Sequence, residues 1–598
     1  MKKHFKPLTL LMSFLLIFTL LSGCGNGGEA ALVLTNGVVY TVDGDNWQNE
    51  PAEAVAVDAN GIILFVGSAA EAYIGDDAKV IDLDGKVVFP GFIDSHCHAP
   101  GFMLTKLFEI YLYESFTLEQ TLAVIAAFIE ENPDFDVYWG TGYSVAIGGD
   151  PRGPRAEWLD EISADKPIIL ISNDEHNYWM NSIAFEMNGI TSDTPVPAGG
   201  SIPVDPKTGK LWGTLTGASS LITMERKYTE AQQLEALARF QELMHQWGYT
   251  SVMCLVPHFI DASIYKAFYD SGELALRINL AGGRSGSGWD IGEVIDETLT
   301  WRDSLKNSEL LSVSSIKFFA DGVVEGMTAY LSEPYDAAAG LAPDFRGEPY
   351  WNAEELKEHF ARTIAAGFQI YVHSIGDAAT SEALNALEYA QNRNPGVDAR
   401  SVLTHLQLVK DADKSRMGQL NIIGNTQPFW HIKAPGWFEV IELIALGEER
   451  ALKMYPVKSL MDAGVTVTFS SDHPVTSINN PFWAIQAAVT RNLYAGEFFG
   501  VEDITDMDDP TWLLGPDERV SVKDAIEAYT INGAYQLFRE HEVGSIAVGK
   551  RADFIIADRD IFDLNPIDIS DTKVLATIFN GRVVYEVSPI VNSLTGRK

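Results

Sequence analysis

The sequence predicts an α/β protein: a (β/α)8 TIM-like barrel with inserted segments, joined to a small β-sandwich that both termini form together. Three observations support this prediction. Short apolar strands alternate with amphipathic helical stretches from about residue 89 to 540, a pattern typical of a parallel sheet covered by helices. Residues 31–88 and 541–598 instead contain short strands separated by turns, too few at either end for a stable sheet. The length of 598 residues also exceeds what a single core usually supports.

Turn signals divide the terminal strands. Asn36-Gly37, Asn60-Gly61 and Asn580-Gly581 are dipeptides that favour two-residue hairpins. Because the two ends share this pattern, we expect 31–88 and 541–598 to form one composite β-sandwich, which leaves 89–540 as the catalytic barrel.

Seven apolar segments are candidate barrel strands: 167–171, 250–254, 275–279, 315–319, 369–373, 401–405 and 465–470. Amphipathic helices are expected over 231–247 and 353–366, the second beginning after Asn352 as its N-cap. The Pro- and Gly-rich stretch 194–217 interrupts the alternation, so an insertion is expected around 185–240.

The composition excludes some classes of function. The chain has 82 acidic and 43 basic residues, a formal net charge of −39, which argues against nucleic acid as a partner because phosphates need cationic residues. Most of these carboxylates are expected to form a solvated surface. Three cysteines are too few for a disulfide framework.

The N-terminus has the layout of a signal peptide. Basic residues precede an apolar run over 8–21 that is too short for a confident transmembrane helix. The sequence Leu-Ser-Gly-Cys that ends at Cys24 resembles a bacterial lipobox. We therefore expect a signal peptide over 1–23, lipidation of Cys24, a tether over 24–30 and an extracytoplasmic, lipid-anchored location at a bacterial membrane. An ordinary cleaved signal and an uncleaved anchor are the alternatives.

Polar residues fall where the predicted strands end. His96 and His98 are spaced i, i+2 at the end of an extended run, so their imidazoles share one face. Each position alone is weak evidence, because a single histidine at a strand end usually makes only hydrogen bonds. In a barrel, however, the C-terminal strand ends converge on one mouth. The set expected there suits zinc and comprises His96, His98, Lys317, His373, His405 and Asp472.

Lys317 lies inside an apolar strand, where an unpaired ammonium is costly. If its amine is carboxylated, it becomes an anionic carbamate able to bridge two metal ions.

Several segments carry a family resemblance. Residues 90–98, Pro-Gly-Phe-Ile-Asp-Ser-His-Cys-His, resemble the first-strand signature of the amidohydrolase superfamily. Further segments narrow the resemblance to amidohydrolase family 3, the N-substituted formamide deformylase-like group: 173–182, 317–322, 373–377, 404–405, 427–428 and 471–475. Residues 544–554 are similar to the sandwich signature of the superfamily.

The resemblance implies a metal-dependent hydrolase barrel whose ligands are His96, His98, His373 and His405. It also implies a bridging carbamate on Lys317, and Asp472 as catalytic base and further ligand. The cofactor expected is a divalent metal, two zinc ions or one if Lys317 is not carboxylated. The reaction implied is hydrolysis of a C–N bond in an amide, formamide or cyclic amide by metal-activated hydroxide.

Other polar residues have weaker assignments. His176 is expected to contact the substrate, with a structural role as the alternative, and Gln427 is expected to line the pocket. Cys97 points away from the two neighbouring histidines on an extended strand, so it is predicted to pack in the core. Cys254 lies in an apolar strand and is also read as buried.

Two alternatives remain for the function. One keeps the fold but makes the protein a mononuclear deaminase with Lys317 unmodified; the other is a catalytically inactive extracytoplasmic binding protein. The expected partner is a small-molecule substrate, with membrane attachment only through the N-terminal lipid, and a homodimer is compatible with the resemblance. The stretch after Lys317 and the aromatic run 429–431 depart from the family pattern, which leaves the substrate open.

Overall fold

The computed structural model describes residues 30–587 except 116, 146, 151, 173–176, 197–200, 217, 256–259 and 285. The predicted signal peptide and the lipidation site at Cys24 lie outside the described residues, as does His176. Within the described part of the chain, no helix combines the length and the apolar character needed to cross a membrane.

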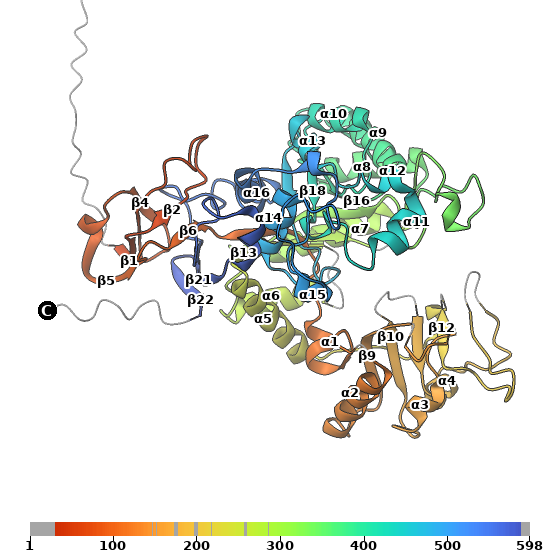
Figure 1. Cartoon of the computed structure of the whole chain (residues 1–598). Coiled ribbons are helices and arrows are strands. Elements are labelled where there is room, and N and C mark those ends of the chain that lie inside the picture. Colours follow the sequence, from red (N-terminus) through yellow and green to blue (C-terminus); the bar gives the residue numbers. More distant parts are fainter. Residues whose placement is uncertain are drawn as a thin grey trace, which may run out of the picture.

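A parallel barrel forms the centre of the protein (Figure 1). Its eight strands follow the order of the chain around the barrel. They are β7 (Phe92–Cys97), β13 (Tyr249–Leu255), β14 (Arg277–Gly283), β15 (Leu311–Phe319), β16 (Gln369–Ser374), β17 (Val402–His405), β18 (Ile423–Thr426) and β19 (Val467–Phe469). The first and last strands meet just beyond their ends, where Asp472 N–H donates to His96 O at 2.8 Å and His98 N–H donates to His473 O at 2.8 Å. The predicted TIM-like barrel is thus confirmed as a nearly closed one.

Amphipathic helices connect and cover the strands. They include α5 (Glu230–Gln246), α6 (Ala262–Asp270), α7 (Ile291–Leu305), α8 (Ala353–Ala365), α9 (Asp377–Arg393), α10 (Asp411–Gln419), α13 (Val457–Asp462), α14 (Pro481–Thr490), α16 (Val522–Tyr529) and α17 (Ile531–Gln536). The predicted N-cap is present: the Asn352 side chain accepts from the backbone N–H groups of Glu354 and Glu355, which satisfies donors that the first turn leaves free.

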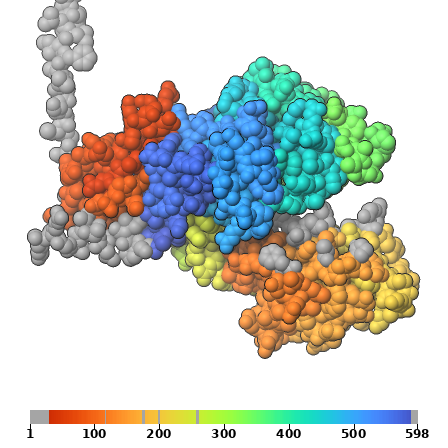
Figure 2. Space-filling model, in the orientation of Figure 1, coloured from red at the N-terminus to blue at the C-terminus, as the bar shows by residue number. Residues whose placement is uncertain are grey.

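A separate sheet interrupts the barrel between β7 and β13. It comprises β8 (Ile110–Tyr111), β9 (Tyr138–Tyr143), β10 (Ile168–Ser172), β11 (Asn177–Met180) and β12 (Thr214–Thr216), with α2 (Leu118–Glu131), α3 (Ala156–Asp160) and α4 (Ser182–Met187) packed on it. In the space-filling view it forms a distinct lobe beside the barrel (Figure 2). This sheet begins well before residue 185, where the insertion was expected to start.

The prediction that 167–171 is a barrel strand is therefore wrong. β10 pairs with β9 and β11 inside the inserted sheet. Ile168 and Leu170 pack in one hydrophobic cluster of the lobe and Ile169 in another. A strand that is buried on both faces has a continuous apolar sequence whether it belongs to the barrel or to the inserted sheet. Hydrophobic periodicity therefore does not show which of the two sheets contains residues 167–171.

The two ends of the chain meet in one sheet. β2 (Val38–Val39) and β6 (Val87–Pro90) join β20 (Phe554–Ala557), β21 (Val574–Phe579) and β22 (Arg582–Glu586), with Phe89 opposite Ile555. A second sheet contains β1 (Ala30–Thr35), β3 (Ala54–Val57), β4 (Ile63–Gly67) and β5 (Ile74–Asp82). One buried cluster includes Leu34 and Val55 from this second sheet with Val88 and Phe554 from the first, so side chains of the two sheets share one hydrophobic cluster.

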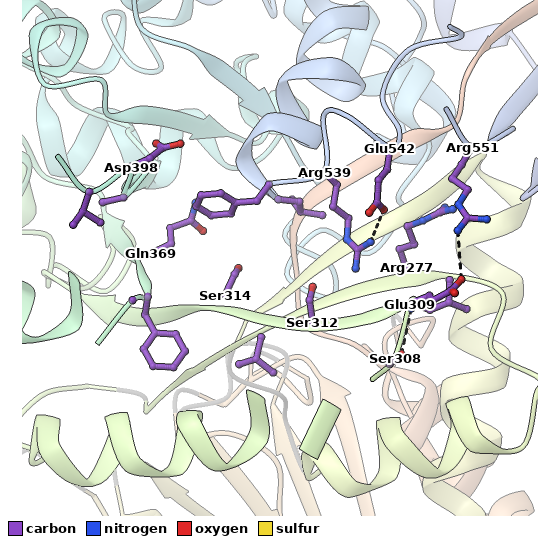
Figure 3. A pocket seen from close by; sticks show the side chains of 18 of the residues that line it. Arg277, Ser308, Glu309, Ser312, Ser314, Gln369, Asp398, Arg539, Glu542 and Arg551 are labelled. Atoms are coloured by element: carbon purple, nitrogen blue, oxygen red, sulfur yellow. Dashed lines mark hydrogen bonds and ion pairs between the residues drawn. The ribbon is translucent and has the colours of Figure 1, made fainter. Parts of the chain in front are cut away.

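A hollow of about 740 Å³ lies at the end of the barrel opposite the mouth, where the N-terminal parts of β14, β15 and β16 meet the C-terminal segment (Figure 3). Its arginines are already paired: Arg539 with Glu542 at 2.8 Å, Arg551 with Glu309 at 3.4 Å, and buried Arg277 with Asp553. Because each cation has a carboxylate partner, the hollow serves as a polar junction between the barrel and the terminal sheet.

Candidate metal centre and active-site cavity

The polar residues that end the barrel strands line one cavity of about 550 Å³. β7 supplies His96 and leads directly to His98, β15 supplies Lys317, and β16 and β17 supply His373 and His405. Asp472 follows β19 across the mouth. All six of these predicted site residues line the cavity, because parallel strands in a barrel point their C-terminal ends in the same direction.

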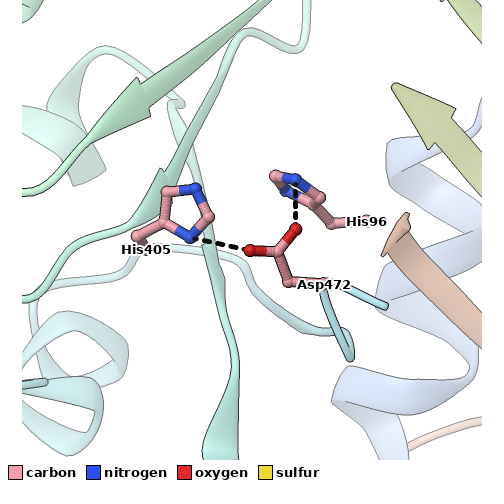
Figure 4. Close-up of side chains that lie close together, drawn as sticks. All are labelled: His96, His405 and Asp472. Carbon is pink, nitrogen blue, oxygen red and sulfur yellow. Dashed lines mark ion pairs between the residues drawn. The ribbon is translucent and has the colours of Figure 1, made fainter. Parts of the chain in front are cut away.

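Asp472 is the point on which the histidines converge (Figure 4). Its Oδ1 atom lies 3.1 Å from His96 Nε2 and 3.2 Å from His98 Nε2. Its Oδ2 atom lies 4.0 Å from His405 Nδ1. The donor atoms of His96, His405 and Asp472 all lie within 4.8 Å of one another, close enough to share one metal ion.

In both His96 and His98, the outer ring nitrogen, Nδ1, which points away from Asp472, lies against an oxygen atom. His98 Nδ1 lies 2.6 Å from the carbonyl oxygen of Leu255, which only an N–H can satisfy. His96 Nδ1 lies 2.9 Å from Thr404 Oγ1 and 3.2 Å from Tyr371 OH. The Thr404 hydroxyl donates to Asn425 Oδ1 and the Tyr371 hydroxyl donates to Ser95 O, so His96 Nδ1 must carry the hydrogen.

These contacts define the state of the inner nitrogens. In a neutral imidazole with a protonated Nδ1, Nε2 is an acceptor, so His96 and His98 both present acceptors to a carboxylate oxygen that is itself an acceptor. Among the described residues, the buried His96 Nε2 has no hydrogen-bond partner of suitable geometry. Acceptors facing one another at 3.1–3.2 Å are unfavourable unless a cation lies between them. The donor set therefore fits a divalent metal ion.

His373 and His405 extend the donor set, with ring centroids 4.5 Å apart. His373 Nε2 lies 3.0 Å from Gly322 O and therefore donates to it, which leaves Nδ1 as the acceptor. His405 Nδ1 lies 2.9 Å from Gln427 Oε1. Such outer contacts fix the tautomer and orientation of metal-binding histidines.

Burial keeps His96, His373 and His405 neutral. It lowers the pKa of His96 to about 3 and that of His373 to about 4, and the positive charge of Lys317 adds to both shifts. The pKa of His405 is also well below its ordinary value, first because of burial and then because of His373. Neutral imidazole is the form that binds a metal.

The charged partners respond to the same environment. The pKa of Asp472 lies well below its usual range although burial opposes this, so the carboxylate is ionised and its negative charge faces the inner nitrogens of His96 and His98. Burial lowers the pKa of Lys317 to about 7, against the opposing effect of Asp472. Its Nζ atom lies 5.1 Å from the Phe319 ring centroid and 5.2 Å from that of Tyr371, so it is the loss of solvent, and not these ring contacts, that favours the uncharged amine.

The backbone at the site adopts a rare conformation. Asp472 has φ of 57° and His405 has φ of 75°, in the left-handed region that costs energy for residues other than glycine. Asp94 supports this geometry, because its Oδ1 accepts from Ser471 N–H at 3.0 Å and from His96 N–H at 3.3 Å. The buried Asp94 thus joins the first strand to the segment that carries Asp472.

Gln427 requires a correction. We expected it to line the pocket as a substrate-binding residue, but it is fully buried behind His405 and is not among the residues that line the cavity. Its amide oxygen lies against His405 Nδ1, and its NH2 group donates to Ser470 Oγ at 2.9 Å and to Asn425 Oδ1 at 3.0 Å. Because both ends of the amide are used in the interior, Gln427 is a positioning residue for His405.

Sequence reasoning missed two supporting residues, Tyr371 and Thr404. Each lies on a barrel strand beside a predicted ligand, and Tyr371 shares its strand face with His373 at spacing i, i+2. That spacing is a signal the sequence does contain. Cys97 and Cys254 are buried and unpaired, as expected for residues that only pack.

Aromatic side chains form much of the cavity wall. Trp430 stacks on His405 with centroids 5.7 Å apart and an interplanar angle of 21°. The ring centroid of Phe319 lies 5.2 Å from that of His373. Further aromatic residues line the outer part: Phe429, Trp437, Tyr455, Trp483, Tyr494, Phe498 and Phe499. The cavity therefore offers a polar floor and an apolar wall, the usual composition of a small-molecule site.

A parallel barrel with histidines and an aspartate converging at its mouth defines a metal-dependent hydrolase of the TIM-barrel class. The amidohydrolase family model, family 3, matches residues 79–585, so this chain belongs to the amidohydrolase family. Membership and the donor set together support hydrolysis of carbon–nitrogen bonds as its general chemistry, with a divalent metal as cofactor.

Individual relatives cover almost the whole chain. It is 30% identical over 579 residues to protein LONG AFTER FAR-RED 3 of Arabidopsis thaliana, covering 94% of this chain and 92% of that protein. It is 29% identical to the N-substituted formamide deformylase of Arthrobacter pascens, covering 93% and 98%. A solved structure of an uncharacterized metal-dependent hydrolase from Pyrococcus furiosus matches with a TM-score of 0.65 and 25% identity, covering 90% of this chain and 99% of that one.

Proposed function

We propose that this protein hydrolyses the C–N bond of an N-substituted formamide, an amide or a cyclic amide. The observation that carries the proposal is the convergence of His96 Nε2 and His98 Nε2 on one oxygen of Asp472. The relative from Arthrobacter pascens, named for deformylation of N-substituted formamides, supports formamides as the first substrates to test.

The side chains around this point have separate tasks. His96, His98, His373 and His405 would hold the metal, which supplies polarisation of the carbonyl and a water of lowered pKa when bound. Asp472 is ionised and lies in the cavity, so it can accept the proton of the attacking water and return it to the leaving amine. Trp430 and Phe319 shield this exchange from bulk solvent.

We propose further that Lys317 is carboxylated and bridges two zinc ions. A buried amine with its pKa lowered to about 7 is largely uncharged near neutral pH, and only the uncharged amine can attack carbon dioxide. The alternative is a mononuclear deaminase, favoured by one observation: the donor atoms that lie within 4.8 Å of one another come from His96, His405 and Asp472 alone among the described residues.

Attachment and assembly are also proposals. The lipobox-like sequence at Cys24 supports a lipid-anchored, extracytoplasmic enzyme, and a homodimer is the assembly to test first. We further propose that the two sheets formed by the chain ends act as a single β-sandwich that supports the barrel.

The proposed reaction can be tested with zinc-loaded protein and N-benzylformamide. Release of benzylamine that stops on chelation and returns with zinc would support the proposal. Metal analysis separates the two site models, because two ions per chain support the carboxylated Lys317 and one ion supports the mononuclear site. Binding of zinc without hydrolysis of any formamide, amide or cyclic amide would overturn the proposed reaction.

A further inference from the structure

A carboxylate without a partner lies in the outer part of the active-site cavity. Glu442 lines this cavity and is only 7% exposed. Its Oε2 atom is fully buried and has no hydrogen-bond partner within the described part of the chain. Burying a carboxylate without compensation costs several kcal/mol, so such a group needs an explanation.

The charges around Glu442 make its burial more costly. Glu325, an accessible residue in the loop after β15, lines the same cavity. Burial, followed by the negative charges of Glu325 and Glu439, raises the pKa of Glu442 to about 8. The one lysine that lines the cavity, Lys317, belongs to the metal centre at the other end. The two glutamates therefore face a space that would stabilise a positive charge.

Aromatic rings connect this acidic pair to the metal centre. Trp430 stacks on His405, and its ring centroid lies 6.5 Å from that of Tyr455. Burial and then the negative charges of Glu442 and Glu325 raise the pKa of the Tyr455 hydroxyl, against the opposing positive charge of Arg491. Rings of this kind attract alkylammonium groups. Glu442 also closes a π-helical turn over Phe438–Glu442, a local structure that often occurs at functional sites.

We propose that Glu442 and Glu325 form a cation subsite, and that the substrate carries a protonated amine remote from the bond that is cleaved. The proposal rests on the proposed function, because the same cavity holds both the metal centre and the subsite. The ammonium group would donate to Glu442 Oε2 and lie against the aromatic wall, while the formamide or amide end faces Asp472. The substrate class is then an acylated or formylated diamine, or another amide with a basic tail.

Substrate pairs test the subsite through turnover. The wild-type enzyme is given monoformylated α,ω-diamines of increasing chain length, each compared with the N-alkylformamide of equal length. We expect one chain length at which kcat/KM favours the amine about 10–100-fold, the range of a hydrogen bond to a charged group. Glu442→Gln should remove this preference by lowering kcat/KM for the amine substrate toward the value for the neutral substrate of equal length. Wild-type enzyme that turns over both series equally at every length would overturn the proposal.

Direct binding separates a failed subsite from a failed reaction. Pentyltrimethylammonium cannot ligate a metal, and its binding to the zinc-loaded protein is measured by calorimetry. This quaternary cation has no N–H to donate, so it tests the charge of the subsite. We expect Glu442→Gln to weaken binding at least about tenfold, because the variant removes a negative charge from a poorly solvated cavity. Glu439→Gln, an exposed charge on the same helical segment, should leave binding within about twofold because exposed charges contribute little. Equal binding to wild type and Glu442→Gln overturns the subsite even if formamides are hydrolysed. Weakened binding supports it even if they are not.

A second variant tests the subsite if Glu442→Gln does not fold. Thermal unfolding shows whether Glu442→Gln is folded, and Glu325→Gln alters an accessible position that should tolerate the change. If Glu442→Gln fails to fold, Glu325→Gln decides, because Glu325 lines the cavity whereas Glu439 does not. We expect weaker pentyltrimethylammonium binding by about threefold or more, and unchanged binding overturns the proposal.

Discussion

Replacing Asp472 by asparagine tests both roles assigned to this residue. The change keeps the shape of the side chain but removes its charge and introduces an NH2 group. Loss of the base should lower kcat about 10²–10⁴-fold, equivalent to about 3–5 kcal/mol of activation free energy. The assay is benzylamine release from N-benzylformamide by zinc-loaded protein, with metal content measured on the same sample.

The metal-free protein gives an independent readout. His96 Nε2 and His98 Nε2 lie 3.1 and 3.2 Å from Asp472 Oδ1, where acceptors face an acceptor. An amide can donate at this point, and each hydrogen bond gained is worth about 0.5–1.5 kcal/mol. We therefore expect the metal-free Asp472→Asn protein to unfold at a higher temperature than the metal-free wild type.

The matched control is Asp462→Asn. Asp462 is an exposed residue of α13, in the helix before β19, and it pairs with Lys458 on the same helix. Its loss should change stability by no more than about 1 kcal/mol and leave turnover intact. Turnover by metal-loaded Asp472→Asn within tenfold of wild type would falsify its assignment as the base. A lower unfolding temperature of the metal-free variant would contradict the acceptor arrangement described above.

Four further predictions follow from the same contacts. Gln427→Leu should weaken zinc binding about 10–100-fold by releasing His405, measured by competition with a chelator; an unchanged affinity would mean that His405 is held by other groups. Chelation should abolish turnover and lower the unfolding temperature, since an ion present at 100 times its Kd stabilises the native state by about 2.7 kcal/mol, and a metal-free protein with the same melting curve would argue against a resident ion. Arg277→Met should cost about 3–5 kcal/mol in denaturant unfolding, because it leaves the buried Asp553 carboxylate without its cation and, among the described residues, with only the N–H of Asn580 still donating to it; a cost below about 1 kcal/mol would show that this ion pair contributes little to stability. The pKa of Glu442 has an ordinary value of 4.5 and a value of about 8 in the folded protein, so the stability of the folded state should fall as the pH rises between these values. Glu442→Gln should therefore be more stable than the wild type at pH 8, and this difference should vanish near pH 4. Parallel profiles of stability against pH for the two proteins would refute this prediction.

Much of the barrel was predictable because its signals are local. Six of the seven predicted barrel strands, beginning with 250–254 and ending with 465–470, correspond to β13 to β17 and β19. Their apolar runs end in polar residues, and the rule that parallel strands point one way then brings Lys317, His373 and His405 together. β18 was not named, since Ile423–Thr426 is short and mostly polar, and its place in the barrel depends on pairing with β17 and β19.

The assignment of 167–171 failed for the opposite reason. An apolar run of this length has the same appearance in the barrel and in the inserted sheet, and only its partners, β9 and β11, distinguish them. Gln427 illustrates the same limit at the level of one side chain. The side chain of a polar residue at a strand end can point into the cavity or lie behind a metal ligand, and the sequence alone does not indicate which of the two occurs.

Some features of this protein therefore follow from the sequence alone, and others are decided only by the tertiary structure. The sequence was enough to indicate the barrel, the residues expected in the metal centre and the family. These conclusions depend on strand periodicity, on turn dipeptides and on the order of six residues along the chain: His96, His98, Lys317, His373, His405 and Asp472. Each of these signals depends on neighbouring residues or on a fixed strand direction. Tertiary structure alone decided which nitrogen of each histidine is held by an outer oxygen, that Gln427 supports His405, and that Glu442 is buried without a partner in the outer cavity. These features depend on contacts between residues far apart in the chain, such as His96 with Tyr371 and Thr404, and on the loss of solvent around them. Neither distance nor desolvation is encoded in the local pattern of a sequence.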